Sequence, residues 1–305
     1  MQASPKRIVL TAIVVDLLDI AFNLIATIIT GSVVMLAETL QGFSDLVSDS
    51  FALIGLTRSK KRADSQHQFG YGKETYFWAI LASLMMIAVT AGLSIYFGWQ
   101  RLLQPTGLSH LWIALLITIS SLITNSYSLS LSTRRLFSDL KSKRLDHCWQ
   151  AFVESPQVVV KSTFVLDFVG FLAAVIGLVT VVLLSTTGNN IFDGLGAIGV
   201  GLLLIFLGLT LLMGLKGFVI GRSVSEETRG QIIAITESIP GVIKVLDLKT
   251  MHLGSEKILV NLEIHAKNNL TTDQLEVIID KIKTKLIANL PKISHVQVEL
   301  ETPNP

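Results

Sequence analysis

Six stretches of mostly apolar residues fill the first two thirds of the chain. A membrane-spanning helix needs roughly 20 such residues in a row, and each of these stretches is at least that long. The hydrophobic pattern therefore predicts a membrane protein built as an all-α bundle of six spanning helices. The predicted spans are residues 8–29, 33–57, 76–99, 111–132, 157–185 and 191–215.

The rest of the chain alternates between apolar and polar positions with the periods of soluble secondary structure. A spacing of three and four predicts helices, whereas strict alternation predicts strands. The resulting α-β-β-α-β order suits a small two-layer α+β domain. We therefore predict two domains, residues 1–221 in the membrane and residues 222–305 as a soluble C-terminal domain. Its expected elements are a helix over 226–238, strands over 242–252 and 257–265, a helix over 270–290 capped by Thr271 or Thr272, and a strand over 295–300.

Composition supports a membrane protein and excludes several other classes. Of the residues, 50% are hydrophobic and 16% are charged, whereas soluble proteins contain about 25% charged residues. The net charge of +2 is too small to indicate a nucleic-acid partner. The single cysteine, Cys148, excludes an intrachain disulfide and a zinc cluster built from cysteines. The sequence has no His-Glu-x-x-His helix and no nucleophile constellation, so we predict neither an enzyme nor a resident cofactor.

Basic residues are concentrated in the loops that follow the second and fourth apolar stretches. The opposite loops contain Arg101 alone. Because short cytoplasmic loops are rich in lysine and arginine, we expect both termini and the C-terminal domain in the cytoplasm or on the equivalent side of an organelle membrane. The basic positions are Arg58, Lys60, Lys61, Arg62, Lys73, Arg134, Arg135, Lys141, Lys143 and Arg144.

Two pairs of polar residues interrupt the second and fifth apolar stretches. Gln41 and Asp45 are four residues apart, and so are Thr163 and Asp167. On a helix this spacing places both side chains of a pair on one face, one turn apart. A carboxylate inside a membrane helix costs roughly 3 kcal/mol or more, so it usually faces a partner, a cavity or an ion path. Two such helices with facing pairs would form an oxygen-rich cation site, and we therefore predict an ion transporter.

Several ordered motifs show that the chain resembles the cation diffusion facilitator family of zinc-transporter-like metal/proton antiporters. Residues 30–49 resemble the signature of that family's second helix, and residues 67–73 resemble its His-x-Phe-Gly-His-Gly-Lys loop. Residues 187–196 and 221–223 resemble its sixth helix and the exit from it, and look closest to the branch of mitochondrial zinc transporter 9-like members. The resemblance implies six spans, an αββαβ cytoplasmic domain, efflux of a divalent metal by alternating access with proton counter-flow, and a homodimer.

The chain departs from the family pattern where the chemistry matters most. Gln41 stands where the family has His or Asp, and Thr163 stands where it has His. Tyr71 replaces a loop histidine, which weakens the family's second metal site at the interface. Separately, His67 is either an ordinary loop residue or a weaker candidate to bind metal together with Asp64. The resemblance also implies tail ligands at positions where zinc-loaded members have histidine. In this sequence those positions are Glu263, Glu276, Glu299 and Glu301.

Other polar residues have competing interpretations. Asp49 lies one turn from Asp45 and is either a further ligand or a charge near the end of its helix. Asp16, Asp19 and Asn23 share one face of the first helix and are candidates to line a wet cavity. Asp193 is expected to have a structural role at the start of the sixth helix, where the helix dipole favours a carboxylate. The adjacent residues His147 and Cys148 are a weak metal signal, and Lys161 is expected to extend toward the interface.

The proposed ligands are all oxygen atoms, which has consequences for the metal and for proton exchange. Oxygen ligands suit Mn²⁺, Fe²⁺ or Mg²⁺ better than Zn²⁺, whereas the branch resemblance keeps zinc possible. Without histidine in the site, exchanged protons would have to bind to the carboxylates. Three alternatives remain: a non-transporting partner subunit, a cation channel without proton coupling, and, least supported, an intramembrane metalloenzyme.

Overall fold

The computed structural model describes residues 5–141 and 158–302, which form two compact units. One unit comprises the described residues of 1–57 and 75–215, and the other comprises 58–74 together with 216–302. The segment between the second and third predicted spans therefore belongs to the same compact unit as the C-terminal domain.

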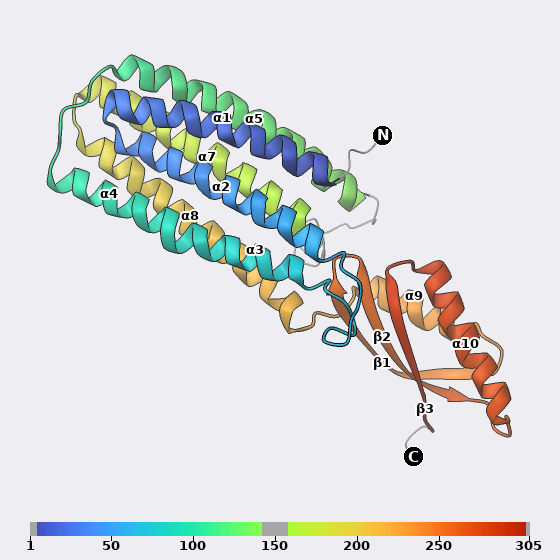
Figure 1. Cartoon of the computed structure of the whole chain (residues 1–305). Coiled ribbons are helices and arrows are strands. Elements are labelled where there is room, and N and C mark those ends of the chain that lie inside the picture. The colour runs from blue at the N-terminus through green and yellow to red at the C-terminus, as the bar shows by residue number, and fades with distance from the viewer. Residues whose placement is uncertain (1–4, 142–157, 303–305) are drawn as a thin grey trace. The chain divides into compact units, whose positions relative to one another are not determined.

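The first unit is a bundle of long helices (Figure 1). Most ends of these helices lie close to the ends of the predicted apolar stretches. Three of the turns between helices contain Gly31, Gly107 or Gly188 with polar neighbours, which end the apolar stretches there. The helices are α1 (Pro5–Thr30), α2 (Val33–Arg58), α3 (Glu74–Met85), the π-helical turn η1 (Met86–Ala91), α4 (Gly92–Leu103), α5 (Leu111–Lys141), α7 (Val158–Thr187) and α8 (Ile191–Ile220).

Within residues 5–141 and 158–302, four helical segments are long and apolar enough to cross a membrane. They are Glu74–Leu103, Leu111–Arg134, Ser162–Thr187 and Ile191–Ile220, and they correspond to the last four predicted spans. The chain is therefore an integral membrane protein. Helices α1 and α2 cover the first two predicted spans and are 26 residues long each, but they are not among these four. A count of six spans stays a prediction.

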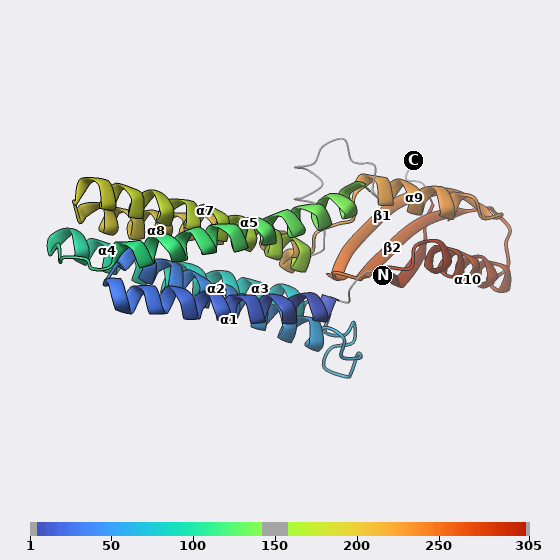
Figure 2. The same cartoon turned by 90° about the horizontal axis from the view of Figure 1, so that it is seen from above.

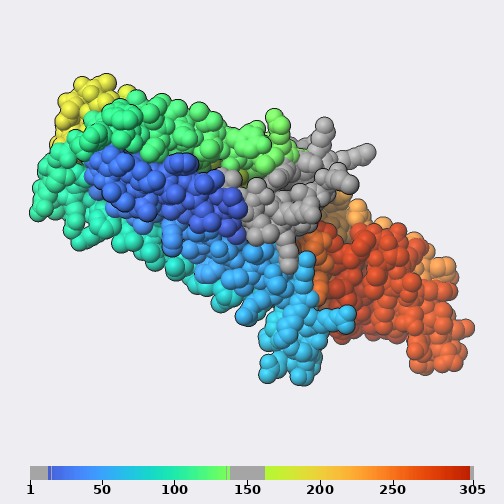
Figure 3. All heavy atoms as spheres, turned by 45° about the horizontal axis from the view of Figure 1, so that its top comes forward, coloured from blue at the N-terminus to red at the C-terminus, as the bar shows by residue number. Residues whose placement is uncertain are grey.

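Helix α1 lies on the outside of the bundle, beside α5 (Figures 2 and 3). Its outward side chains are apolar; Ile28, for example, is 74% exposed. The packed interior of the bundle consists mainly of small and branched residues of α7 and α8, such as Val169, Ala173, Val200 and Leu204. An apolar exterior around a packed interior is what a helix bundle needs when lipid surrounds it.

The C-terminal elements have the predicted order. They are α9 (Glu226–Glu237), β1 (Val242–Gly254), β2 (Lys257–Ala266), α10 (Thr272–Asn289) and β3 (Ile293–Leu300). The sheet order is β1-β2-β3; β2 pairs with β1 antiparallel and with β3 parallel. Because a parallel pair needs a long crossover connection, α10 stands between β2 and β3. Thr271 caps α10 through a capping box with Gln274, which selects it over Thr272.

One face of this sheet forms the core of the domain. Val260, Leu262 and Ile264 of β2 are fully buried, and they pack in one cluster with Ile282 of α10 and Ile232 of α9. Side chains alternate along a strand, so the intervening residues Asn261, Glu263 and His265 face the other side and are only partly buried. The second face of the sheet is therefore polar and has no helix layer in the described domain.

The segment of residues 58–74 packs on the turn between β1 and β2. A Cβ atom at Gly72 would collide with the carbonyl oxygen of Leu253, and one at Gly254 would lie 2.9 Å from the Cα atom of Gly72. The rings of Phe69 and His295 meet edge to face at 5.5 Å. Glycine at positions 72 and 254 is what permits this close backbone approach.

Candidate metal site in the helix bundle

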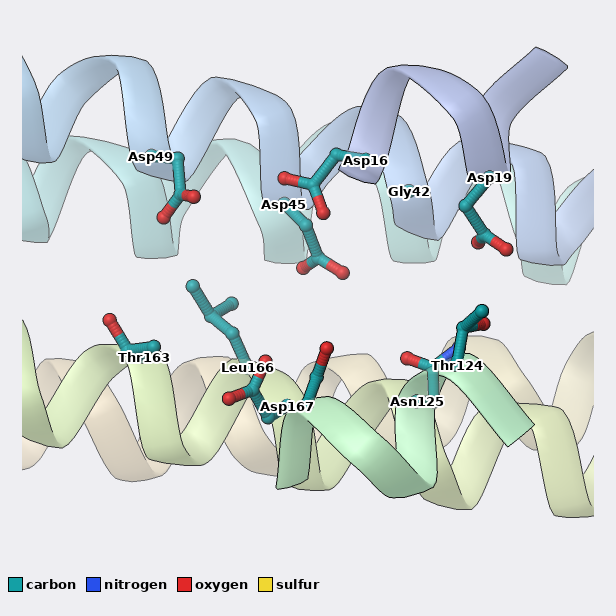
Figure 4. Close-up of a pocket in the computed structure, with 11 residues that line it drawn as sticks. Asp16, Asp19, Gly42, Asp45, Asp49, Thr124, Asn125, Thr163, Leu166 and Asp167 are labelled. Atoms are coloured by element: carbon teal, nitrogen blue, oxygen red, sulfur yellow. The ribbon is translucent and has the colours of Figure 1, made fainter. Parts of the chain in front are cut away.

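A cavity between four helices is lined mainly by polar residues (Figure 4). Its volume is about 50 Å³, several times the ~10–15 Å³ that one water molecule requires. The lining residues are Asp16 and Asp19 of α1, Gly42, Asp45 and Asp49 of α2, Thr124, Asn125 and Ser128 of α5, and Thr163, Leu166 and Asp167 of α7.

Helical spacing and small residues position the two predicted pairs. Asp45 on α2 and Asp167 on α7 point into the cavity from opposite walls, and Thr163 lies one turn from Asp167 (Figure 4). A Cβ atom at Gly170 of α7 would collide with the amide oxygen of Asn125 and lie 3.2 Å from Nε2 of Gln41. Glycine at this position therefore lets α7 approach α2 and α5 beside the cavity.

Asp45 is held by a neighbour on its own helix. Nε2 of Gln41 donates a hydrogen bond of 3.0 Å to Oδ2 of Asp45. Oδ1 of Asp45 is buried and has no hydrogen-bond partner among the described residues. Gln41 itself is 6% exposed and does not line the cavity. The cavity lining therefore includes Asp45, Thr163 and Asp167, and Gln41 donates to the Asp45 carboxylate from one turn away.

Helix α1 contributes two further carboxylates, as its polar face predicts. Asp16 lies next to Asp45 (Figure 4), and Asp19 accepts hydrogen bonds from Nδ2 of Asn23 at 3.1 Å and Oγ of Ser121 at 3.0 Å. Asn23 is 1% exposed and lies behind Asp19 rather than in the cavity wall. Asp49, one turn from Asp45, also lines the cavity.

The sequence reading missed the contribution of α5. Thr124, Asn125 and Ser128 interrupt an apolar helix, and Thr124 and Ser128 have the same spacing of four as the pairs on α2 and α7. That spacing was a usable signal. Hydroxyls in membrane helices commonly bond to the preceding turn, as Thr124 does to the Ser120 carbonyl. A hydroxyl in a membrane helix is therefore a weaker indication of a binding site than a carboxylate.

The donor set determines what the cavity can bind. Five carboxylates share it with hydroxyl and amide groups. Like charges repel strongly where the dielectric constant is low, so this set needs a cation, bound protons or both. Oxygen donors of this kind suit hard divalent cations. In the described residues no three His, Cys, Asp or Glu side chains form a ready-made metal centre, so the carboxylates line an open cavity rather than a closed coordination shell.

The loop candidates are engaged by other protein groups. Oδ2 of Asp64 accepts hydrogen bonds from the Tyr71 hydroxyl at 2.6 Å and the Lys61 ammonium at 3.1 Å. Oδ1 accepts the backbone N–H of His67 at 2.8 Å. These bonds, that from Tyr71 foremost, hold the pKa of the Asp64 carboxyl well below its usual range. The His67 ring lies 3.7 Å from Asp64, so the candidate pair is adjacent, with a lysine ammonium already beside the carboxylate.

The tail candidates are only partly brought together. Glu263 of β2 and Glu299 of β3 are register partners, and Asp247 of β1 is the partner of Glu263 on its other side. The Lys249 ammonium bridges Asp247 at 2.9 Å and Glu263 at 3.3 Å. Glu276 lies on α10 in the other layer, and Glu301 follows β3. The tail thus has an acidic row across its open sheet face, with one lysine among the acids.

Asp193 is structural, but its partners differ from the expected one. It is fully buried at the start of α8, and it accepts hydrogen bonds from Oγ of Ser32 at 2.5 Å and from the backbone N–H groups of Val33 and Val34 at 2.9 and 3.1 Å. It therefore caps α2. Nε of Arg101 completes the site at 3.2 Å, and Arg101 also donates to the Gly31 carbonyl. The candidates His147 and Cys148 lie outside the described residues, as does the Lys161 side chain.

Two family models match consecutive parts of the chain. The cation efflux transmembrane domain matches residues 9–214, and the cytoplasmic domain of cation efflux proteins matches residues 224–303. The human proton-coupled zinc antiporter SLC30A9 of mitochondria is 26% identical over 92% of this chain and 51% of its own length. The cation-efflux pump FieF of Klebsiella pneumoniae is 26% identical over 86% of this chain and 81% of its own length.

Several similar solved structures match about a quarter of the chain. A nickel form of a MamM CTD variant is 22% identical over 26% of this chain and 100% of its own length, with a TM-score of 0.25. The chain spans about half the length of the zinc antiporter relatives that it matches.

Proposed function

Because this chain belongs to the cation efflux family, we propose that it moves divalent metal ions out of the cytoplasm in exchange for protons. The metal ion is the transported substrate, and the cavity between α1, α2, α5 and α7 is its binding site inside the bundle. Asp45 and Asp167 provide the principal ligands from opposite walls. Thr163 supplies a neutral oxygen, and Asp16, Asp19 and Asp49 supply further carboxylates within the same cavity.

One observation carries this proposal: five carboxylates from three helices converge on one cavity inside an apolar bundle. A structural role would pair buried carboxylates with arginine, lysine or helix ends, as Arg101 and α2 do for Asp193. Among the residues that the structure describes, the cavity lining includes no lysine or arginine. A bound cation or bound protons would balance the charge of these carboxylates.

The same need to balance the charge of the carboxylates couples release of the metal ion to binding of protons. When a divalent ion leaves the cavity, the carboxylates lose their counter-charge and favour proton binding; when metal returns, it displaces those protons. Alternating access would present the cavity first to one side and then to the other. The basic loops favour the cytoplasm as the side that holds both termini, and α1 and α2 would complete six spans.

The choice of metal is argued from the ligands. The described lining residues offer oxygen donors and include no histidine or cysteine, which favours Mn²⁺ or Fe²⁺ over strict zinc selectivity. Zn²⁺ remains a candidate substrate because relatives of this chain are zinc antiporters.

Reconstituted vesicles loaded with a pH-sensitive dye test the function directly. Metal uptake with matched proton release supports an antiporter, metal flux without proton movement supports a channel, and no flux for Mn²⁺, Fe²⁺ or Zn²⁺ overturns the proposal.

Replacing Gln41 with histidine is expected to shift the preference toward zinc. Gln41 is within hydrogen-bond distance of Asp45, so an imidazole there would add a nitrogen donor one turn from the main carboxylate. Imidazole favours Zn²⁺ over Mn²⁺. The ratio of Zn²⁺ to Mn²⁺ uptake should rise in vesicles, whereas Gln41→Asp should leave an all-oxygen site. An unchanged ratio in Gln41→His would show that position 41 acts on Asp45 without reaching the ion.

The C-terminal domain is proposed to assemble a homodimer. The matched family model is that of the cytoplasmic domain, and the open sheet face of Glu263 and Glu299 has no covering layer in the described domain. Light scattering of the full chain in detergent should give a dimer mass, and truncation after residue 221 should give a monomer. A monomeric full chain at high concentration, with and without metal, would contradict dimerisation through this domain.

A further inference from the structure

Helix α2 carries one more carboxyl group, outside the cavity and deeper in the bundle. Glu38 precedes Asp45 by seven residues, or two helical turns, so it lies on the same face about 10 Å closer to the start of α2. It is 4% exposed. Neither the cavity lining nor the described ion pairs include it. The proposed transport site therefore does not explain why a carboxyl group is buried here.

Glu38 lies against a glycine of the neighbouring helix. Helix α7 presents Gly177, where a Cβ atom would collide with Oε1 of Glu38 and lie 3.5 Å from the Thr118 methyl group of α5. Oε1 has no hydrogen-bond partner among the described residues. The Thr118 hydroxyl donates to the Ala114 carbonyl of its own helix. Asp19 of α1 is the ionisable group whose charge acts on Glu38, and it is itself acidic.

Polar side chains of α1 and α5 form a hydrogen-bonded cluster that adjoins the cavity. Asn23 of α1 bonds to Asp19 at 3.1 Å and to Ser121 of α5 at 3.4 Å, and Ser121 bonds to Asp19 at 3.0 Å. Asp19 lines the cavity. The amide oxygen of Asn23 is the second buried acceptor here that lacks a partner in the described structure. Such acceptors are rare in packed proteins because each is unfavourable unless water or a proton satisfies it.

A buried carboxylate with neither a cation nor a donor is strongly unfavourable, whereas a carboxylic acid is tolerated. The contact with Gly177 leaves no space for the several oxygen ligands that a divalent metal requires. We propose that Glu38 is a proton-binding group of the transport cycle, which holds one of the counter-protons between the cavity and the end of the bundle where α2 begins. This assignment rests on the proposed antiport function and specifies where one proton is held.

The exchange step at Glu38 involves a proton alone. The carboxylate accepts a proton from water that enters from the end of the bundle where α2 begins, and it becomes a neutral carboxylic acid. In the opposite conformation the proton leaves through water and the polar groups of Asn23, Ser121 and Asp19, and the carboxylate is regenerated. No electron transfer or covalent bond to another heavy atom is involved.

The test uses the full chain in vesicles at zero membrane voltage, with Mn²⁺ and an imposed difference of one pH unit. At equilibrium the Mn²⁺ ratio across the membrane changes tenfold for each proton exchanged per metal ion. Glu38→Gln should therefore lower the ratio about tenfold while Mn²⁺ still exchanges down its own gradient. Glu38→Asp retains a titratable group and should keep the wild-type ratio. Thr39→Val, a buried neighbour without a titratable group, should also keep it.

The outcomes of this experiment distinguish the role of Glu38 from the antiport function itself. An unchanged ratio in Glu38→Gln overturns the role of Glu38 while leaving antiport intact. A wild-type protein that moves Mn²⁺ without any dependence on the pH difference overturns both proposals. If Glu38→Gln does not fold, Glu38→Met is similar in length and also lacks an exchangeable proton, so it provides the same test. An infrared band of a protonated carboxyl group in the wild type, absent in the Glu38 variant, would support the assignment independently.

Discussion

Substituting Asp45 or Asp167 with asparagine is expected to abolish metal flux while leaving the protein folded. Both side chains line the cavity from opposite walls, and the amide is close in shape to the carboxylate but lacks its charge. Loss of an outer-sphere partner already lowers metal affinity or activity ~10–100-fold, so loss of a direct ligand should lower Mn²⁺ or Zn²⁺ uptake by more than about 100-fold.

The control for this experiment must be polar, buried and remote from the cavity. Ser94→Ala meets these conditions, because Ser94 of α4 is 1% exposed and its hydroxyl donates a hydrogen bond to the Thr90 carbonyl of the same helical segment. It should retain full uptake. Near-wild-type uptake by a folded Asp45→Asn or Asp167→Asn protein would show that the residue concerned is not a required ligand.

Substituting Asp193 with alanine is expected to destabilise the bundle rather than to change the transported ion. The variant would leave Arg101 buried without its carboxylate, and it would remove the acceptor for two N–H groups at the start of α2. Removing one partner of a buried ion pair costs about 3–5 kcal/mol. Thermal unfolding in detergent, followed by size-exclusion chromatography, should show a lower midpoint and less folded protein than in wild type.

Asn190→Ala is the matched control at the same end of the bundle. Asn190 donates one exposed hydrogen bond to the Thr106 carbonyl, so its loss should change the stability by no more than about 0.5 kcal/mol. Equal unfolding midpoints for the two variants would contradict a structural role for Asp193. Any Asp193→Ala protein that remains folded should keep the metal preference of the wild type.

Much of the architecture could be predicted because it depends on local patterns. Apolar length determined the helix boundaries of the bundle to within a few residues except at the end of α5, which continues to Lys141 beyond the predicted 132. Period-two alternation identified β1, β2 and β3, and capping chemistry narrowed the start of α10 to Thr271 or Thr272, of which the structure uses Thr271. The pairs on α2 and α7 were predictable for the same reason, since a spacing of four on a helix determines which side chains share a face.

The contributions that were missed depend on which helices are neighbours. Nothing local in the sequence indicates that Asn125 of α5 faces Gly170 of α7, or that the Gln41 amide lies beside the same glycine and bonds to Asp45. Asp193 illustrates the same limit. Its position at the start of α8 suggested the dipole of that helix, whereas its backbone hydrogen bonds go to α2, more than 150 residues away in sequence.

The loop shows how a family departure is accommodated locally. With tyrosine at position 71, the phenol donates to Asp64, and the Lys61 ammonium bonds to both. A hydrogen-bonded cluster thus holds the segment that packs on the turn near Gly254. The low pKa of Asp64 keeps this carboxylate charged at neutral pH.

The location of a bound metal ion tests the central claim most directly. The full chain should be crystallised with Mn²⁺, and the ion should be located by its anomalous scattering. The account predicts a peak in the cavity, within about 2.0–2.6 Å of carboxylate oxygens of both Asp45 and Asp167, and no such peak in Asp45→Asn. Mn²⁺ found only at the acidic row of Asp247, Glu263 and Glu299, or only beside Asp64, with none in the cavity, would contradict it.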